Sequence, residues 1–424
     1  MRKYDSYKDS GVKWIGELPS HWKVIPFKRV AKVKTNLVHP EDYLSYPQVS
    51  PDCIEKGSGK LIKYETVEKA NVESDNHLFF KGQLLYSKIR PLLNKITIAP
   101  FDGLCSADMY PIETTMDTAF LKYMMLSDSF LESVRIVVRD RVKMPKINQE
   151  ELSQTILLYP PLTEQLVIAT YLDRKSAEID EHISKVEREI ELLKEYKQAE
   201  IARVVTHGLN PNAPTKPSGI SWIGDIPAHW EVKRLASAFT ENKSLNSDIL
   251  YTEAYKFNYG ALVRKDEDTS LTDDVLETYK KYTVIKPNDI LINGLNLNYD
   301  FVSQRVAISY ANGIITSAYL AITPRENINP AYYCYLLKSM DAKKLFHGMG
   351  TGIRLTLSFG ELKKQQILFP PIGEQEEIVK YINYKTTEID RLVVELTYQV
   401  EYLKEYKQRL IADVVTGKIN VQPD

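Results

Sequence analysis

One nonapeptide is written twice in this 424-residue chain, and the duplication constrains the fold more than any other feature. The sequence WIGELPSHW runs from Trp14 to Trp22, and WIGDIPAHW runs from Trp222 to Trp230. All four tryptophans of the chain lie in these two copies. A motif that recurs half a chain later indicates a repeated structural unit, so we predict two similar halves.

The repeat extends to the end of each half. YPPLTEQ from Tyr159 matches FPPIGEQ from Phe369, and LKEYKQ recurs letter for letter in both halves. Between these landmarks, Tyr123 aligns with Tyr333. Each half therefore has a constant start and a constant end around a divergent middle.

The divergent middles have the pattern of mixed α/β domains. The short runs LLYSKI, ITIAP, DILI and RVAISY have the composition of strands. The dipeptides Asp102-Gly103 and Asn312-Gly313 predict hairpin turns. Each middle closes with a helical pattern, FLKYMMLSDSFLESV in the first half and AYYCYLLKSMDAKKLF in the second.

A long helix closes each half. Thr163 and Gly373 follow the two Pro-Pro pairs and are predicted as N-caps, and Gly208 and Gly417 end the helices. The first helix would extend roughly 65 Å at 1.5 Å per residue. Apolar residues step by four and three along both helices, which is the pattern of a coiled-coil seam. The seam residues are Ile179, Ile183, Val186, Ile190 and Leu193 in the first helix, and Ile389, Val393, Leu396, Val400 and Leu403 in the second.

The fold class is therefore α/β, with two mixed α/β domains joined by two long helices. The predicted organisation is a first domain over residues 1–158, a spacer helix over 159–208, a second domain over 209–368, a second spacer helix over 369–417 and a tail over 418–424. Because the two seams match in position, the helices are natural partners for each other.

Composition excludes several classes of protein. With 43% hydrophobic and 26% charged residues, the chain is globular rather than disordered, and no apolar run approaches the ~20 residues of a membrane span. The first residues lack the apolar core of a signal peptide, so we expect a cytoplasmic protein. Cys53, Cys105 and Cys334 have no CxxC spacing and the histidines have no metal-ligand spacing, so no metal site is predicted.

A net charge of -1 means that any contact with nucleic acid must come from local segments. The candidates are Lys88, Arg90, Lys95, Arg139, Arg141 and Lys143 in the first half, and Asn293, Asn296, Asn298, Gln304, Arg305 and Arg354 in the second. Lysine and arginine suit phosphate, and asparagine and glutamine can pair with adenine. Alternatively, Arg90 and Lys95 pair with local carboxylates, and the Asn-rich stretch forms a turn.

The repeated tryptophan motif has two alternative roles. Its aromatic and histidine side chains could stack on bases. A structural role is favoured, because modules that read different targets have no use for an identical stacking platform. We therefore interpret Trp14, Trp22, Trp222 and Trp230 as a structural clasp between each module and the helices.

The catalytic motifs in the chain are incomplete. YPPL and FPPI are similar to the Pro-Pro motif of amino-methyltransferases, but Tyr159 and Phe369 stand where an Asp or Asn would accept the amino hydrogen bond. GMGTG from Gly348 lacks the lysine of a phosphate-binding loop and is interpreted as a turn that leads to Arg354. We therefore assign no catalytic residue.

The ordered set of motifs resembles the specificity subunits of Type I restriction-modification systems. The resemblance covers essentially the whole chain. It rests on the order of WIGELPSHW, KIRPLLNK followed by FDGLCSAD, PPLTEQ and LKEYKQRLIADVVTGKI. The resemblance implies two target recognition domains that each read one half of a bipartite site in double-stranded DNA. It also implies an antiparallel coiled coil that holds these domains apart, with an internal pseudo-two-fold repeat.

The same resemblance implies a non-catalytic subunit without a cofactor of its own. Its partners would be methyltransferase (modification) subunits, which bind S-adenosylmethionine, and restriction motor-nuclease subunits. Two alternatives stay open: an adaptor whose coiled coil binds only protein, and a stand-alone methyltransferase or nuclease. Salt-dependent, selective binding to a split DNA site distinguishes the first hypothesis from the adaptor, and methyl transfer by the chain alone would indicate the enzyme.

Overall fold

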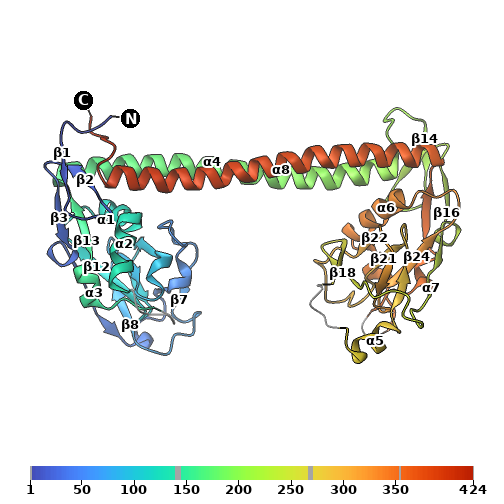
Figure 1. The fold of residues 1–424 in the computed structure, drawn as a ribbon, viewed down its shortest axis with the longest axis horizontal. Coiled ribbons are helices and arrows are strands. Elements are labelled where there is room, and N and C mark those ends of the chain that lie inside the picture. The colour runs from blue at the N-terminus through green and yellow to red at the C-terminus, as the bar shows by residue number, and fades with distance from the viewer. Residues whose placement is uncertain (1, 139–144, 266–270, 353–354, 424) are drawn as a thin grey trace. The chain divides into compact units, whose positions relative to one another are not determined.

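The chain folds into two compact units. The computed structural model describes residues 2–138, 145–265, 271–352 and 355–423. The first unit comprises residues 1–187 and 397–424, and the second unit comprises residues 188–396. Both boundaries fall inside the long helices α4 (Leu162–His207) and α8 (Ile372–Val415), which are labelled in Figure 1. Each unit therefore contains one α/β module and a segment of each long helix.

A four-stranded antiparallel sheet and a five-stranded mixed sheet form the first module. Their strand orders are β10-β9-β12-β4 and β5-β8-β11-β6-β7, and β11 runs parallel to β6. Two strand pairs, β1-β2 and β3-β13, complete it. The strands are β1 (Tyr7–Asp9), β2 (Glu17–Pro19), β3 (Lys23–Pro26), β4 (Ala31–Val33), β5 (Leu37–Val38), β6 (Pro47–Val49), β7 (Glu65–Thr66), β8 (Asn76–Phe79), β9 (Leu84–Ser87), β10 (Ile96–Ile98), β11 (Gly103–Cys105), β12 (Met109–Thr114) and β13 (Ile156–Tyr159). The helices are α1 (Thr118–Leu126), α2 (Asp128–Val137) and α3 (Gln149–Gln154).

The second module repeats the four-stranded sheet in the order β22-β21-β24-β17. The second module also contains four separate strand pairs, which are β14-β15, β16-β25, β18-β19 and β20-β23. The strands are β14 (Thr215–Pro217), β15 (Asp225–Pro227), β16 (Glu231–Arg234), β17 (Phe239–Glu241), β18 (Tyr255–Asn258), β19 (Ala261–Arg264), β20 (Thr283–Ile285), β21 (Ile290–Ile292), β22 (Val306–Ile308), β23 (Gly313–Ile315), β24 (Leu320–Pro324) and β25 (Gln366–Phe369). The helices are α5 (Asp273–Tyr279), α6 (Pro330–Ala342) and α7 (Phe359–Leu362). No helix in the described part of the chain is both long and apolar enough to cross a membrane.

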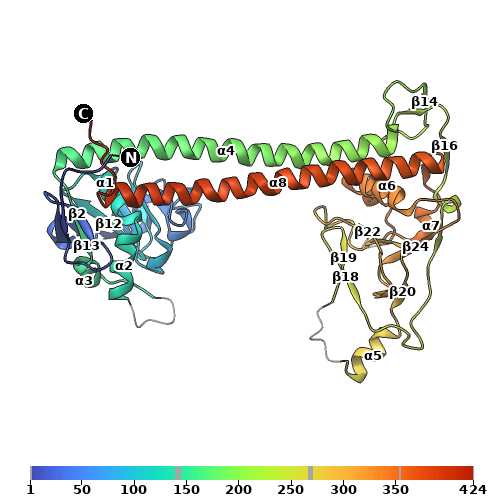
Figure 2. The same ribbon diagram turned by 45° about the horizontal axis from the view of Figure 1, so that its top comes forward.

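The core of the second unit includes its segments of the long helices. Val204 and Val205 of α4 belong to the same buried apolar cluster as Ile378 and Ile382 of α8 and the indole of Trp230. Helix α6 lies between the long helices and the strands of the four-stranded sheet (Figure 2). Because the removal of this apolar surface from water stabilises both parts together, module and helix segments form one folded unit.

The ten predicted seam residues line the contact between α4 and α8. Six of them are buried and the remaining four are half-buried. In the first unit, Lys407 Nζ lies 2.8 Å from Asp180 Oδ2, and in the second unit Lys197 Nζ lies 2.7 Å from Asp390. Within each unit the helices therefore pack antiparallel, with an apolar seam bordered by ion pairs.

Both long helices begin earlier than predicted. They start at Leu162 and Ile372, so Thr163 and Gly373 lie inside the first turn rather than at the N-caps. The carbonyl of Pro161 accepts hydrogen bonds from the N–H groups of Glu164 and Gln165. The first hydrogen bonds of α4 are therefore accepted by the main-chain carbonyl of Pro161, not by the hydroxyl of Thr163. The helix ends agree with the prediction, because Gly208 and Gly417 both adopt a φ of +74°.

The two predicted hairpins are wrong. Gly103 opens β11, which pairs with β8 and β6 rather than with β10, and Gly313 opens β23, which pairs with β20 rather than with β22. A Cβ on Gly103 would lie 2.5 Å from the carbonyl oxygen of Pro47, and one on Gly313 would lie 2.7 Å from that of Glu253. Glycine is needed here because a neighbouring strand approaches closely, not because the chain turns.

Burial of the helix seam predicts that a charge placed in it will lower the stability of the first unit. Ile183 is 7% exposed, so Ile183→Asp would place an unpaired charge between the helices and is expected to destabilise the first unit by roughly 3 kcal/mol. Ser184→Asp, one position along on the exposed face, is the control and should cost less than about 0.5 kcal/mol. Urea unfolding followed by circular dichroism measures both. Equal unfolding midpoints for the two variants would contradict the packed seam.

Candidate nucleic-acid interface

A tryptophan and a glutamate join the first module to the long helices. Trp22 is wholly buried, and its Nε1 donates a hydrogen bond of 3.1 Å to Oε1 of Glu164 in the first turn of α4. His21 Nε2 lies 2.8 Å from the other oxygen of this carboxylate. On the opposite side, a Cβ on Gly417 would lie 3.4 Å from the Trp22 ring. This first clasp, made of His21, Trp22 and Glu164, therefore contacts the start of α4 and the end of α8.

The second clasp repeats this arrangement with the two helices exchanged. Trp230 Nε1 donates a 2.8 Å hydrogen bond to Glu374 Oε2, and His229 Nε2 pairs with the other oxygen. Glu374 lies in the first turn of α8, whereas a Cβ on Gly208, after α4, would lie 3.2 Å from the Trp230 ring. His229, Trp230 and Glu374 thus hold the second module as the first clasp holds the first.

The glutamine that follows each clasp glutamate orients a helix of the module. Gln165 Nε2 donates to the carbonyl of Pro160, and its Oε1 accepts from the N–H of Asp117, the N-cap of α1. Gln375 makes the same two bonds, to Pro370 and from Asn329, the N-cap of α6. The Glu-Gln pair of PPLTEQ and PPIGEQ is therefore an anchoring element. Sequence reasoning used these letters only to align the halves and missed their role.

Trp14 and Trp222, predicted as clasp residues, have a different environment from Trp22 and Trp230. Trp14 is 37% exposed, and its Nε1 donates to the carbonyl of Ser129 in α2. Trp222 is half-buried and packs against the apolar core of the second unit. These two indoles pack on their own modules and make no hydrogen bond to a clasp glutamate among the described contacts.

The hydrogen bonds to the long helices revise the alignment of the two modules. Tyr123 Oη donates to Asp173 Oδ1 at 2.6 Å, and Tyr335 Oη donates to Asn383 Oδ1 at 2.8 Å. Asp173 and Asn383 occupy equivalent places in the helical repeat, so Tyr335, not Tyr333, is the counterpart of Tyr123. Tyr333 instead donates to the carbonyl of Leu368. Relative to the sequence alignment, the second module therefore has two more residues before this tyrosine and two fewer between it and the long helix.

The basic candidates of the first module have unequal exposure. Lys95 is half-buried, and its Nζ donates to the carbonyl of Pro51 at 2.7 Å. Lys88 is also half-buried, with its Nζ 3.8 Å from Asp108 and over the ring of Tyr110. Arg90 is exposed and adopts a φ of +46°. The predicted contacts Arg139, Arg141 and Lys143 lie outside the described residues.

Four of the candidates in the second module belong to the loop over residues 293–304, and their exposure differs. Asn296 is exposed at a φ of +54°, and its carbonyl accepts from the N–H groups of Tyr299 and Asp300, as in a turn. Asn293 is half-buried and also stabilises the turn, because its Oδ1 accepts from the N–H of Leu295. Gln304 is exposed at the end of the loop. Asn298 is half-buried, and Arg354 lies outside the described residues.

Arg305 has no exposed surface, which removes it from the candidate DNA contacts. Its guanidinium donates to the carbonyls of Asn293 and Leu295, at 2.9 and 2.7 Å, and to the carbonyl of Asp300. The backbone N–H of Arg305 donates to the buried carboxylate of Asp341. A guanidinium that is committed to these carbonyls cannot reach a phosphate, so Arg305 stabilises the loop over residues 293–304 instead.

The loop braced by Arg305 presents aromatic and apolar side chains to solvent. Tyr299 is 77% exposed and Val302 is 91% exposed. Phe301 stacks on His347, with 4.6 Å between ring centroids and 16° between planes. Hydrogen bonds from Ser303, with smaller contributions from Val302 N–H and Arg305, lower the pKa of Asp300 to about 2. The loop is therefore held in shape by polar contacts while its apolar tips remain accessible.

The described residues contain no group of three His, Cys, Asp or Glu side chains arranged to hold a metal ion. The three cysteines are buried and unpaired. Burial raises the pKa of Cys334 to about 11 and that of Cys105 further, so neither thiol is a nucleophile at neutral pH.

Comparison with known proteins finds relatives among the specificity subunits of Type I restriction enzymes. Residues 227–397 match the family described as Type I restriction modification DNA specificity domain. The chain is 40% identical over 176 residues to the EcoDI specificity subunit of Escherichia coli, which covers 42% of this chain and 39% of that relative. It is 23% identical over 436 residues to the putative MjaX specificity subunit of Methanocaldococcus jannaschii, which covers 98% of both chains.

Two solved structures share the fold. A chain from a structure of complex assembly in a type I R-M system superposes with a TM-score of 0.71 at 17% identity and covers 95% of this chain and 99% of its own length. The HsdS subunit from Thermoanaerobacter tengcongensis superposes with a TM-score of 0.53 at 17% identity, over 95% and 98% of the two chains. Both comparisons support two α/β modules with two long packed helices.

The two clasps predict unequal costs of mutation. Glu164 accepts hydrogen bonds from three side chains, including the hydroxyl of Tyr4, and its side chain is 8% exposed, whereas Glu374 accepts from two and is 35% exposed. We expect Glu164→Ala to cost about 3 kcal/mol and Glu374→Ala about 1 kcal/mol, because buried donors lose their acceptor. Denaturant unfolding of the full chain measures both values. A larger cost at Glu374 would show that the clasps do not depend on buried hydrogen bonds.

Proposed function

Because this chain belongs to the specificity subunits of Type I restriction-modification systems, a non-catalytic family, we propose that each of its modules reads one half of a bipartite DNA site. The recognition domains would comprise residues 1–158 and 209–368, with the helical segments 159–208 and 369–417 as spacers. The chain would act in the cytoplasm. The observation that carries this proposal is the duplicated clasp, which joins each of two different modules to the long helices by the same three residue types.

The duplicated clasp supports DNA reading by the parts of the modules that differ. The clasps use the same His, Trp and Glu contacts, so each module is joined to the long helices in an equivalent way. The loops that diverge between the halves are then free to vary in sequence without loss of the frame. Different loops on equivalent frames suit a protein that reads two different base sequences.

The loop over residues 293–304 is the proposed reading element of the second module. Asn296 and Gln304 offer amide groups that can pair with adenine, and Tyr299 and Val302 offer apolar surface for a thymine methyl or a base face. The buried Arg305 guanidinium holds the loop in one conformation, which lowers the entropy lost on binding. In the first module, we propose that exposed Arg90 contacts phosphate and that Lys88 adds positive potential beside it.

An exposed apolar strip in each unit is the proposed docking surface for a methyltransferase subunit. Tyr402 and Tyr406 of α8 lie exposed in the first unit, and Leu192 and Tyr196 of α4 lie exposed at the equivalent repeat positions in the second. Large exposed aromatic and apolar side chains on a helix are typical of a protein interface. Two equivalent strips would bind two modification subunits, which would carry S-adenosylmethionine, and the complex would recruit the restriction motor-nuclease subunits.

The DNA proposal is tested with the chain in complex with its methyltransferase partner. Tyr299→Ala combined with Gln304→Ala should relax selection at one half of the recognised site and weaken binding about tenfold, since one good base contact contributes roughly 1–3 kcal/mol of discrimination. Selection from a randomised duplex library reports the bases recovered. Arg90→Ala should instead weaken binding to all sequences and lower the salt dependence by about one ion.

Glu326→Ala, at an exposed position in the loop between β24 and α6, is the control and should leave the selected sequence unchanged. A change in both halves of the site after the Tyr299 and Gln304 substitutions would refute modular reading. Binding of the parent complex without sequence preference would favour a protein-only adaptor.

The docking proposal has a separate test. Tyr402→Ser with Tyr406→Ser, and Leu192→Ser with Tyr196→Ser, should each remove one of two bound methyltransferase subunits, because each pair belongs to one strip. Native mass spectrometry of the co-purified complex measures the subunit ratio. Glu191→Ser, beside the second strip, is the control. Retention of two methyltransferase subunits after all four strip substitutions would place docking elsewhere.

A further inference from the structure

The two clasps differ in what covers them. In the first unit, Tyr4 lies over the clasp and its hydroxyl donates to Glu164 Oε1. Its ring stands edge-on to Trp22, with 5.9 Å between centroids, and lies 5.8 Å from His21. Burial, with the Glu164 carboxylate second, raises the pKa of Tyr4 far above its usual range, so the phenol remains a donor.

A neighbouring segment of main chain holds Tyr4 in place. The N–H of Asn420 donates to the carbonyl of Arg2, and the hydroxyl of Tyr7 donates to the carbonyl of Gly417. Two stretches of chain, residues 2–7 and 417–423, therefore lie together at the first clasp. Tyr4 therefore reaches the first clasp on a polypeptide segment that is held by hydrogen bonds to its main chain and to Tyr7.

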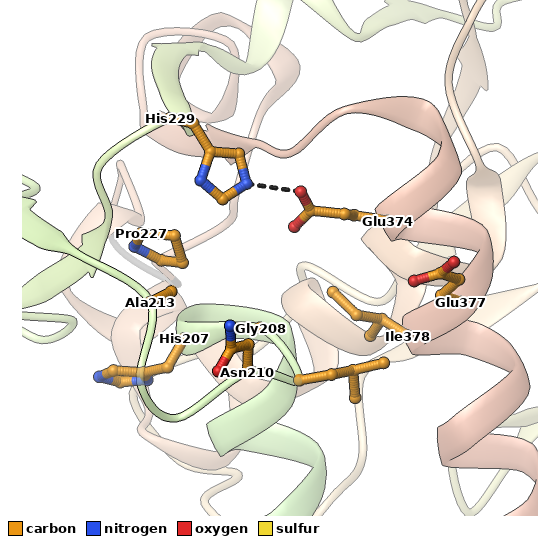
Figure 3. A pocket seen from close by; sticks show the side chains of 10 residues that line it. His207, Gly208, Asn210, Ala213, Pro227, His229, Glu374, Glu377 and Ile378 are labelled. Carbon is orange, nitrogen blue, oxygen red and sulfur yellow. Dashed lines mark hydrogen bonds and ion pairs between the residues drawn. The ribbon is translucent and has the colours of Figure 1, made fainter.

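A cavity adjoins the second clasp beside the counterparts of the two polar neighbours of Tyr4. Its volume is about 260 Å³, and Pro227, His229, Glu374 and Ile378 line it together with residues 207–210 and Ala213 (Figure 3). His229 and Glu374 are the counterparts of His21 and Glu164, the two polar neighbours of Tyr4. The Glu374 side chain is 35% exposed, against 8% for Glu164, and among the described contacts no tyrosine hydroxyl donates to Glu374 as Tyr4 donates to Glu164.

The path of the chain explains the difference. Strand pairing shows that Tyr7 and Thr215 are equivalent residues. Tyr7 pairs with Pro19, and Thr215 pairs with Pro227, the corresponding proline of the repeated nonapeptide. The residue three positions before Thr215, and so equivalent to Tyr4, is Asn212. Asn212 is exposed, and its N–H turns back to the side chain of Asn210. At the second clasp the chain therefore continues as one segment, residues 209–215. At the first clasp two separate segments, residues 2–7 and 417–423, lie together.

We propose that this second-clasp cavity binds a tyrosine side chain presented by an extended segment of a partner polypeptide. The phenol hydroxyl would donate to Glu374, and the ring would lie between His229, Pro227 and Ile378. The volume is sufficient, since a cavity of about 150 Å³ holds benzene. A polypeptide is favoured over a free small molecule because the equivalent occupant in the first unit is itself held by main-chain hydrogen bonds. The inference concerns a partner protein and does not depend on how the modules read DNA.

The experiment uses the full chain and the peptide acetyl-RKYDSYKD-amide, which reproduces residues 2–9. Isothermal titration should give one site per chain. The peptide with phenylalanine in place of its first tyrosine should bind at least fivefold more weakly, because the hydrogen bond to Glu374 is lost. Tyr4→Ala in the chain should open the first clasp and raise the stoichiometry from one to two.

Asn212→Tyr is the decisive variant, because it places a tyrosine at the position equivalent to Tyr4. It should fill the cavity from within the chain, raise the thermal unfolding midpoint and weaken peptide binding at least tenfold. Asn212→Ser is the matched control and should bind the peptide like the parent. Undiminished peptide binding by Asn212→Tyr, or no peptide binding by the parent chain at millimolar concentration, overturns the proposal.

A second copy of the chain is the competing occupant. Concentration-dependent dimerisation that Asn212→Tyr abolishes, measured by sedimentation velocity, would assign the cavity to the first residues of another copy and overturn its assignment to a different partner. A parent chain that stays monomeric and binds the peptide supports the proposal. Because no DNA is present in these measurements, their failure is distinguishable from failure of the DNA proposal.

Discussion

A carboxylate in the first turn of each long helix, Glu164 or Glu374, joins a module to the helices. Glu164 is almost wholly removed from water, which would be costly without partners, and the indole of Trp22, the ring of His21 and the hydroxyl of Tyr4 supply them. The same indole packs against the glycine that follows α8. One side chain therefore ties a module to two helices that are far apart in the sequence, and Trp230 does the same in the second unit.

The repeated clasp contacts differ in kind from the contacts that shape the exposed loop of the second module. The clasp and the adjoining glutamine use side-chain hydrogen bonds around a buried indole, and they repeat in both halves. The loop over residues 293–304 is stabilised differently. The buried guanidinium of Arg305 donates hydrogen bonds to three of its main-chain carbonyls. The buried cation thus shapes the loop while its tips stay exposed, as preorganised binding loops require.

Much of this architecture was readable from the chain. The heptad spacing identified the helix seam, the glycines marked where both helices end, and runs such as LLYSKI coincide with β9. The hairpins at Gly103 and Gly313 failed because a turn dipeptide reports local preference, whereas strand pairing depends on which distant strand arrives beside it. Arg305 failed as a DNA contact for a related reason, since no local pattern distinguishes a buried arginine from an exposed one.

Duplication and periodicity are properties of residue order, so the sequence alone predicted two related α/β modules, two paired helices and the glycines that end them. It did not predict the first residue of either long helix. The sequence did not predict the roles of Glu164 and Glu374. Their His and Trp partners are more than a hundred positions away in the chain, and tertiary packing brings them together. The tertiary structure also decided that chemically equivalent clasps have different surroundings. Tyr4 covers one clasp, whereas a cavity adjoins the other, because the path of neighbouring chain segments determines which side chain reaches each site.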